Sequence, residues 1–182
     1  MIHVARRVLG ALVVLAIVAG ATLALSSRPR LSSDRRAVER NWLAVRGGLD
    51  ARYKLVDALA RDIAAAGGPP NPIIGQVHSA FADWTALKAD APVASAITIA
   101  NTLEGLARRL EATVNGSPIL KADTTVTAAL RQVTTAPIPP EITPLDEAIA
   151  RYEKDRGGPL RRLVAGPMGF DAIPRLALAA GA

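Results

Sequence analysis

DRRAVERNWLAVRGGLDARYKLVDALARDIAAA, residues 34–66, carries an apolar side chain at every third or fourth position of one register. These positions are Val38, Trp42, Val45, Leu49, Tyr53, Val56, Leu59 and Ile63. Separations of three and four residues place them on one face of an α-helix. The stretch therefore predicts a packed helix about 50 Å long, in which Gly47-Gly48 loosens one turn.

Proline marks the predicted starts of the later helices. It is favoured at the first helical position, because the N–H that it lacks would have no partner there. A capping residue precedes proline at Asn71-Pro72, Ser117-Pro118, Thr143-Pro144 and Gly158-Pro159. Pro92 is expected to open another helix in the same way, and Thr143 with Asp146 resembles a capping box.

Apolar faces with helical spacing follow these starts. One of them runs from Ile119 to Val133, and a last short turn covers residues 160–164. No window shows the strict alternation of a strand. Short links between helices favour antiparallel neighbours. The predicted fold is all-α, with an N-terminal transmembrane helix followed by an antiparallel up-and-down helical bundle.

Residues 8–25, VLGALVVLAIVAGATLAL, contain no charged side chain. As a helix they would span roughly 27 Å, close to the hydrocarbon thickness of a bilayer. Arg6 and Arg7 precede the run, and Arg28 and Arg30 follow it. We therefore predict a membrane anchor with basic flanks over residues 1–30, which makes the chain a single-pass protein of the cell membrane with the lipid bilayer as a partner.

The same features also describe a cleaved signal peptide, with Ala24 and Ser26 at a cleavage site after Ser26. The apolar run is longer than the roughly 7–15 residues of a signal-peptide core, which favours the retained anchor. The arginines after the run favour a cytoplasmic bundle, whereas the signal-like start favours the opposite side. The side of the membrane stays open.

Cysteine and histidine content limits the chemistry. The chain has no Cys, and its two His are His3 and His78. These counts exclude disulfides, thiolate metal sites, Cys nucleophiles and a His-rich metal cluster. No nucleophile-elbow pattern accompanies His78, which is predicted to be a flanking or core residue. We predict no catalytic residue, no metal site, no cofactor and no enzymatic activity.

The net charge of +6 is concentrated at the N-terminus. The first thirty residues hold four arginines and no acid, so the remaining 152 residues carry only +2. A nucleic-acid-binding surface needs clustered positive charge. We therefore predict no nucleic-acid partner.

Three blocks of residues, taken in order, form a recognisable pattern. The first block is Val38, Trp42, Leu49, Arg52, Tyr53, Leu55 and Leu59. The second is Asn101, Leu103, Leu110, Pro118, Leu120, Lys121 and Ala122. The third is Tyr152 followed by LVAGPMGF, residues 163–170. In order and spacing these blocks resemble the LemA family of bacterial membrane proteins. The resemblance implies a single-pass membrane protein with a LemA-like helical bundle, here over residues 31–170, and it implies no catalytic residues.

Four residues are candidates for docking a partner. Trp42 and Trp84 lie on apolar helix faces, where core packing is the first expectation and partner docking the alternative. Met168 and Phe170 lie in a Gly-Pro turn that either folds back on the bundle or forms an apolar tip facing a partner or the bilayer. An apolar C-terminal tail, residues 171–182, follows and is too short to span a membrane.

Two functions follow as expectations. The first is a membrane-anchored interaction or accessory component of a bacterial membrane or envelope assembly, bound to another membrane protein or to itself. The second is a secreted or periplasmic helical module, released by signal-peptide cleavage, that binds an envelope lipid or polymer. The mass of the mature N-terminus separates them.

Overall fold

The computed structural model describes residues 2–67, 71–88, 90–158 and 165–178, with side chains from residue 28 onward. All regular elements in these ranges are helices, which confirms the all-α prediction. They are α1 (Ile2–Ala65), α2 (Pro72–Ala86), α3 (Val93–Gly116), α4 (Pro118–Ala122), α5 (Thr124–Thr135) and α6 (Ile142–Arg156).

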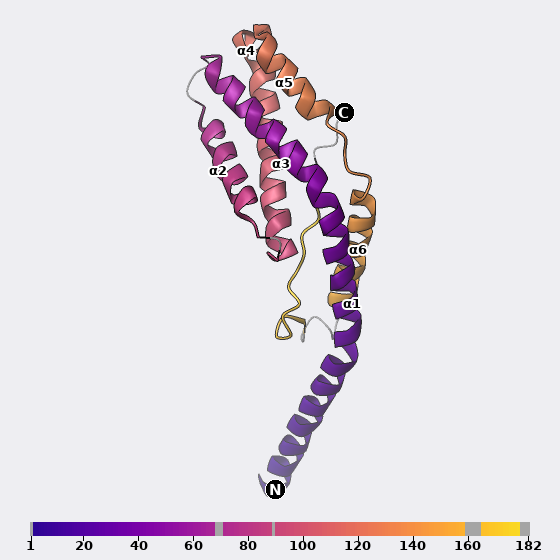
Figure 1. Cartoon of the computed structure of the whole chain (residues 1–182). Coiled ribbons are helices and arrows are strands. Elements are labelled where there is room, and N and C mark those ends of the chain that lie inside the picture. The colour runs from indigo at the N-terminus through magenta and orange to yellow at the C-terminus, as the bar shows by residue number, and fades with distance from the viewer. Residues whose placement is uncertain (1, 68–70, 89, 159–164, 179–182) are drawn as a thin grey trace.

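Helix α1 is the spine of the molecule (Figure 1). It contacts α2, α3, α5 and α6, and all eight positions of its predicted apolar face are buried. Leu31 begins this buried face. Pro29 lies inside the helix and removes one backbone hydrogen bond there, and the helix changes direction where it leaves the bundle (Figure 1).

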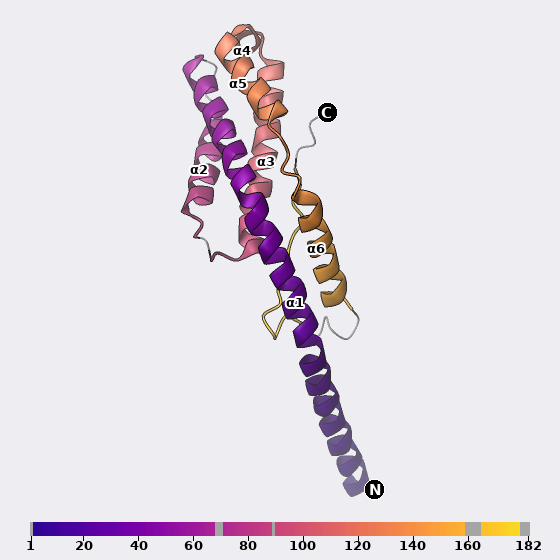
Figure 2. The same ribbon diagram turned by 45° about the vertical axis from the view of Figure 1, so that its right-hand side comes forward.

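Helices α2, α5 and α6 run antiparallel to α1, whereas α3 runs parallel to it (Figure 2). Helix α2 descends beside α1 and α3 returns, joined at its upper end to the short α4. Helices α5 and α6 then follow one another down the length of α1 instead of forming one long helix. Their separation coincides with Pro137, Pro139 and Pro140, which cannot continue a helix.

Two of the predicted caps are present. The Asn71 side chain accepts a hydrogen bond from the N–H of Ile73 at 3.0 Å, and Ser117 accepts one from the N–H of Leu120 at 3.4 Å. Each satisfies an N–H at the helix end that has no partner within the helix. Pro92 also stands immediately before a helix, α3.

The predicted start at Thr143-Pro144 is wrong. Helix α6 begins at Ile142 after Glu141, so Thr143 is not its cap. Pro144 is tolerated in this first turn because the N–H groups there lack partners within the helix. Pro159 and the predicted turn at residues 160–164 lie outside the described residues.

The helix predicted from Ile119 to Val133 is two helices. Helix α4 ends at Ala122 and α5 begins at Thr124. The carboxylate of Asp123 accepts hydrogen bonds from the N–H groups of Thr125 at 2.8 Å and Val126 at 3.0 Å. Asp is a preferred N-cap residue, so this cap competes with continuation of the helix.

The adjacent glycines Gly47 and Gly48 of α1 have different surroundings, and the helix continues through both without the expected loosened turn. A Cβ at Gly48 would clash with the ring of Pro139, whereas a Cβ at Gly47 would meet nothing within 4 Å. The glycine at position 48 therefore allows the 136–141 link to lie close against α1.

Replacing these glycines is expected to give opposite results. Gly48→Ala should lower the free energy of unfolding by about 1–3 kcal/mol, because Pro139 must move. Gly47→Ala should raise it by about 0.5–1 kcal/mol, since alanine favours the helical backbone. Urea unfolding followed by circular dichroism measures both, and equal effects from the two variants would contradict the packing of Pro139.

Across the residues whose side chains the structure describes, no helix is long and apolar enough to cross a membrane. The predicted anchor, residues 8–25, and the predicted cleavage site at Ser26 precede those residues. Their backbone belongs to α1.

Candidate interaction surfaces

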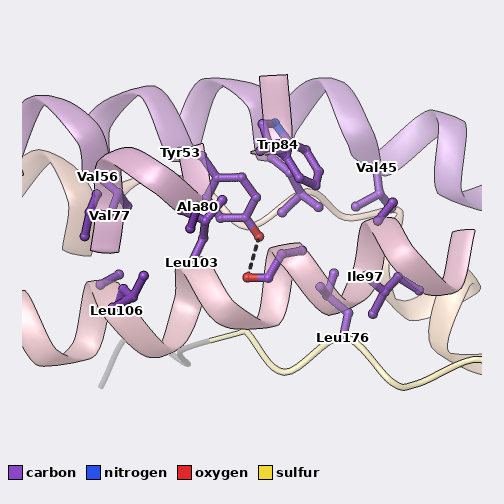
Figure 3. Close-up of a cluster of buried hydrophobic side chains, with 14 of the residues drawn as sticks. Val45, Tyr53, Val56, Val77, Ala80, Trp84, Ile97, Leu103, Leu106 and Leu176 are labelled. Atoms are coloured by element: carbon purple, nitrogen blue, oxygen red, sulfur yellow. Dashed lines mark hydrogen bonds between the residues drawn. The ribbon is translucent and has the colours of Figure 1, made fainter. Parts of the chain in front are cut away.

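The two tryptophans predicted as core residues, with docking as the alternative, are buried in the bundle. The rings of Trp42 and Trp84 meet edge to face with centroids 6.0 Å apart, and Tyr53 meets Trp84 in the same way at 4.9 Å. The indole N–H of Trp84 donates to Asp50 at 2.7 Å. Figure 3 shows Tyr53 and Trp84 among the surrounding apolar side chains. Core packing is therefore correct for both tryptophans, and partner docking is not.

The Gly-Pro turn folds back on the bundle. Phe170 is buried and Met168 is half-buried against the core, so only Met168 keeps accessible surface. Arg35 of α1 donates to the carbonyl of Gly169 at 3.2 Å. The prediction of Phe170 as a docking residue is thereby corrected: its ring closes the core at this end.

A buried ion pair joins α1 to α3. Arg52 donates from Nε to Glu104 Oε1 at 2.7 Å and from Nη2 to Oε2 at 3.1 Å. Its Nη1 donates to the carbonyl of Val133 in α5 at 2.9 Å. The side chains of Arg52 and Glu104 are 7% and 0% exposed. The two-pronged contact, a geometry specific to guanidinium and carboxylate, joins α1 to α3, and the third hydrogen bond joins α1 to α5.

Tyr53 reinforces this polar layer. Its hydroxyl donates to the carbonyl of Ala100 in α3 at 3.3 Å, the contact dashed in Figure 3. Burial raises the pKa of Tyr53, and the charge of Glu104 raises it further. The hydroxyl therefore stays protonated and available as a donor.

His78 is paired with an acid but not with a nucleophile. Its Nδ1 lies 2.7 Å from Asp57 Oδ1, and Arg61 Nη2 lies 3.1 Å from Asp57 Oδ2. Hydrolytic triads add a hydroxyl or thiol to such a pair. Among the described residues no hydroxyl hydrogen bonds to the His78 ring. The observed arrangement connects α2 to α1.

An apolar concavity lies between α1 and the proline-rich link 136–141. It has a volume of about 640 Å³ and is lined mainly by small and apolar groups, including Gly48, Ala51, Leu55 and Pro139. Ile138 on its rim is exposed. Such a groove can admit an apolar side chain or an acyl chain, and the polar residues of its lining are Arg52, Gln132, Thr135 and Glu141.

Exposed arginines surround α1 where it leaves the bundle. Arg28, Arg30, Arg36 and Arg40 are exposed, while Arg35 pairs with Glu39 at 3.0 Å. Positive side chains next to an apolar helix suit the phosphates of lipid head groups.

The metal-ligating residue types do not cluster in the described ranges: no three of His, Cys, Asp and Glu come together there. In comparisons with known proteins, no family model, curated protein or solved structure matches this chain.

Proposed function

We propose that the chain is a non-enzymatic, membrane-anchored, LemA-like helical-bundle protein that acts as an interaction or accessory component of a bacterial membrane or envelope assembly. The observation that carries this proposal is the continuity of α1 from Ile2 to Ala65. One helix contains both the apolar run 8–25 and the core-forming face that begins at Leu31. A helix is the single segment that satisfies its own backbone in lipid, so this helix can carry the bundle directly from the bilayer.

The contacts made by the LemA-like residues support the family proposal. Arg52 binds Glu104, the Asn101 side chain binds backbone groups of the C-terminal segment, and the Tyr152 hydroxyl donates to a backbone carbonyl of that segment. Each of these positions needs a particular polar side chain for its hydrogen bond, whereas a buried apolar position accepts several residue types. The proposed partner is another membrane protein or a second copy of the chain.

The anchor is tested by Val14→Asp/Leu15→Asp. We expect this variant to move from the membrane fraction to the soluble fraction, because an Asp near the centre of a bilayer helix costs about 2.5–3.5 kcal/mol. The matched control is Val14→Leu/Leu15→Val, which keeps the segment apolar and should stay in the membrane. Retention of the Asp variant after carbonate extraction would refute the anchor.

The alternative, a secreted or periplasmic module released by cleavage after Ser26, is distinguished by mass. The intact mass of the mature chain isolated from cells includes residues 1–26 if the anchor is retained. Since the chain has no Cys, Leu43→Cys provides one exposed thiol. Its labelling by a membrane-impermeant maleimide in intact cells then reports the side of the bundle.

A further inference from the structure

Residues 169–178, GFDAIPRLAL, form an extended segment against the bundle, which we call the tail segment. Its buried side chains come at every third position: Phe170, Ile173 and Leu176 are 6%, 8% and 7% exposed. The residues between them are exposed. Three residues per turn is the period of a polyproline II helix, a conformation that docks on grooves in peptide-binding domains. Pro174 falls within the segment and suits this conformation.

The start of the tail segment is set by a glycine turn. Gly169 has φ +77°, a conformation that a residue with a side chain rarely adopts. The N–H of Phe170 donates to the carbonyl of Ala165 at 2.9 Å, and the N–H of Gly169 donates to Gly166 at the same distance. This turn directs the segment back along the bundle, between α3 and α6 (Figure 1).

Asn101 of α3 recognises the backbone of the tail segment. Its Nδ2 donates to the carbonyl of Arg175 at 2.9 Å, and its Oδ1 accepts from the N–H of Ala177 at 2.7 Å. The two contacts flank Leu176, which packs beside Ile97 (Figure 3). One amide side chain thus binds both a backbone acceptor and a backbone donor of the tail segment, which fixes the position of the segment along α3.

Helix α6 supplies the second set of backbone contacts. The Tyr152 hydroxyl donates to the carbonyl of Asp171 at 2.7 Å, and Glu153 Oε1 accepts from the N–H of Ile173 at 2.8 Å. An extended chain with this period leaves its backbone N–H and C=O groups without partners in the same chain, so these side chains meet groups that would otherwise need water. The bundle therefore contacts the backbone of the tail segment in the way that a peptide-binding protein contacts a separate peptide.

We propose that the surface of α3 and α6 that holds the tail segment, which we call the tail groove, is a recognition site for an extended peptide. Its ligand in trans is the tail segment of a second copy, which exchanges with the cis segment. Recognition uses backbone groups and three apolar side chains, and none of these contacts requires the covalent link through residues 157–168. A second copy carries the one peptide whose complementarity to the groove is visible. The inference rests on the proposed function in one respect, because a shared membrane raises the local concentration of copies.

The first test uses the full-length chain in detergent with the labelled peptide GFDAIPRLAL. In the variant I173D/L176D, two buried apolar side chains become charged and the cis segment should leave the groove. We expect this variant to bind the peptide at least tenfold more tightly than the wild type does, where the cis segment competes. Adding Asn101→Ala should remove this gain, and a peptide with Asp at positions 173 and 176 should not bind. A folded I173D/L176D protein that ignores the peptide would overturn the proposal.

The second test keeps the native sequence in the groove and needs no undocked variant. Two differently tagged copies are produced together, one with a photo-crosslinking amino acid at Leu178, which packs against the core. Crosslinks between the two tags are expected, and crosslinks confined to one chain would refute exchange. Neither test reads membrane retention, so a negative result here is separate from the fractionation of the anchor variant.

Discussion

Glu104→Gln is expected to lower the free energy of unfolding by about 3–5 kcal/mol, the usual cost of removing one partner of a buried ion pair. The substitution keeps the shape of the side chain but leaves the guanidinium of Arg52 buried beside a neutral amide. For a chain of this length, each kcal/mol lowers Tm by about 2–4 °C. Thermal unfolding of the detergent-solubilised chain, followed by circular dichroism at 222 nm, measures the shift.

Glu147→Gln is the matched control, since it makes the same chemical change at an exposed position of α6. Its free energy of unfolding should stay within about 0.5 kcal/mol of the wild-type value, so its Tm should change little. The double variant Arg52→Met/Glu104→Leu should recover much of the loss, because removing both charges leaves neither uncompensated. A Glu104→Gln protein that melts like the control would contradict the buried pair.

Trp42→Ala should destabilise the bundle by about 3–5 kcal/mol, the range for deleting a large aromatic side chain from a core. The ring fills space between α1 and α2 and meets Trp84 edge to face, so its loss leaves a cavity and exposes a face of the second indole. Denaturant unfolding gives the free energy, and the emission of the remaining Trp84 should shift to longer wavelength as water reaches it.

The adjacent Leu43 provides the control for this experiment, because it is 60% exposed on the same turn of α1. Leu43→Ala should change the free energy of unfolding by no more than about 0.5 kcal/mol. Equal stability of the Trp42→Ala and Leu43→Ala proteins would show that the ring is on the surface, and would restore Trp42 as a docking residue.

The spine of the bundle could be predicted from sequence because its signal is long and regular. Eight apolar positions in one helical register leave little freedom over which face is buried. The caps at Asn71 and Ser117 could also be predicted, because each residue directly precedes a proline. The break at Asp123 was not predicted, because the apolar positions on its two sides suggest a single helix and the cap signal is confined to one residue.

The buried ion pair was missed for a different reason. Arg52 and Glu104 are 52 positions apart, and their meeting depends on how α1 and α3 pack. A signal did exist: Arg52 lies three residues after Leu49 and four before Val56, so it falls on the apolar face of its helix. A charge in that register predicts a buried partner, but not which acid supplies it.

The tail segment shows the limit of periodicity as a guide. Its buried side chains recur with a period of three, which fits neither the 3.6 of a helix nor the 2 of a strand. From sequence, the two glycines around Pro167 predict a turn that either folds Phe170 back on the bundle or presents it at a partner-facing tip, and the tail after it is predicted as a separate segment. Its backbone binds Asn101, Tyr152 and Glu153, which come from two helices elsewhere in the sequence, and no local sequence pattern predicts these contacts.

Because α1 is one helix, the number of a residue in it also gives its distance from the apolar run. In the proposed membrane-anchored arrangement, each residue after the apolar run adds about 1.5 Å of helix, so the groove beside Gly48 lies roughly 35 Å along α1 from Leu25. Any protein that reaches this groove from the same membrane must itself project to a similar height. Inserting whole turns of helix at Arg30 would then change this distance without altering the apolar run or the buried face that begins at Leu31.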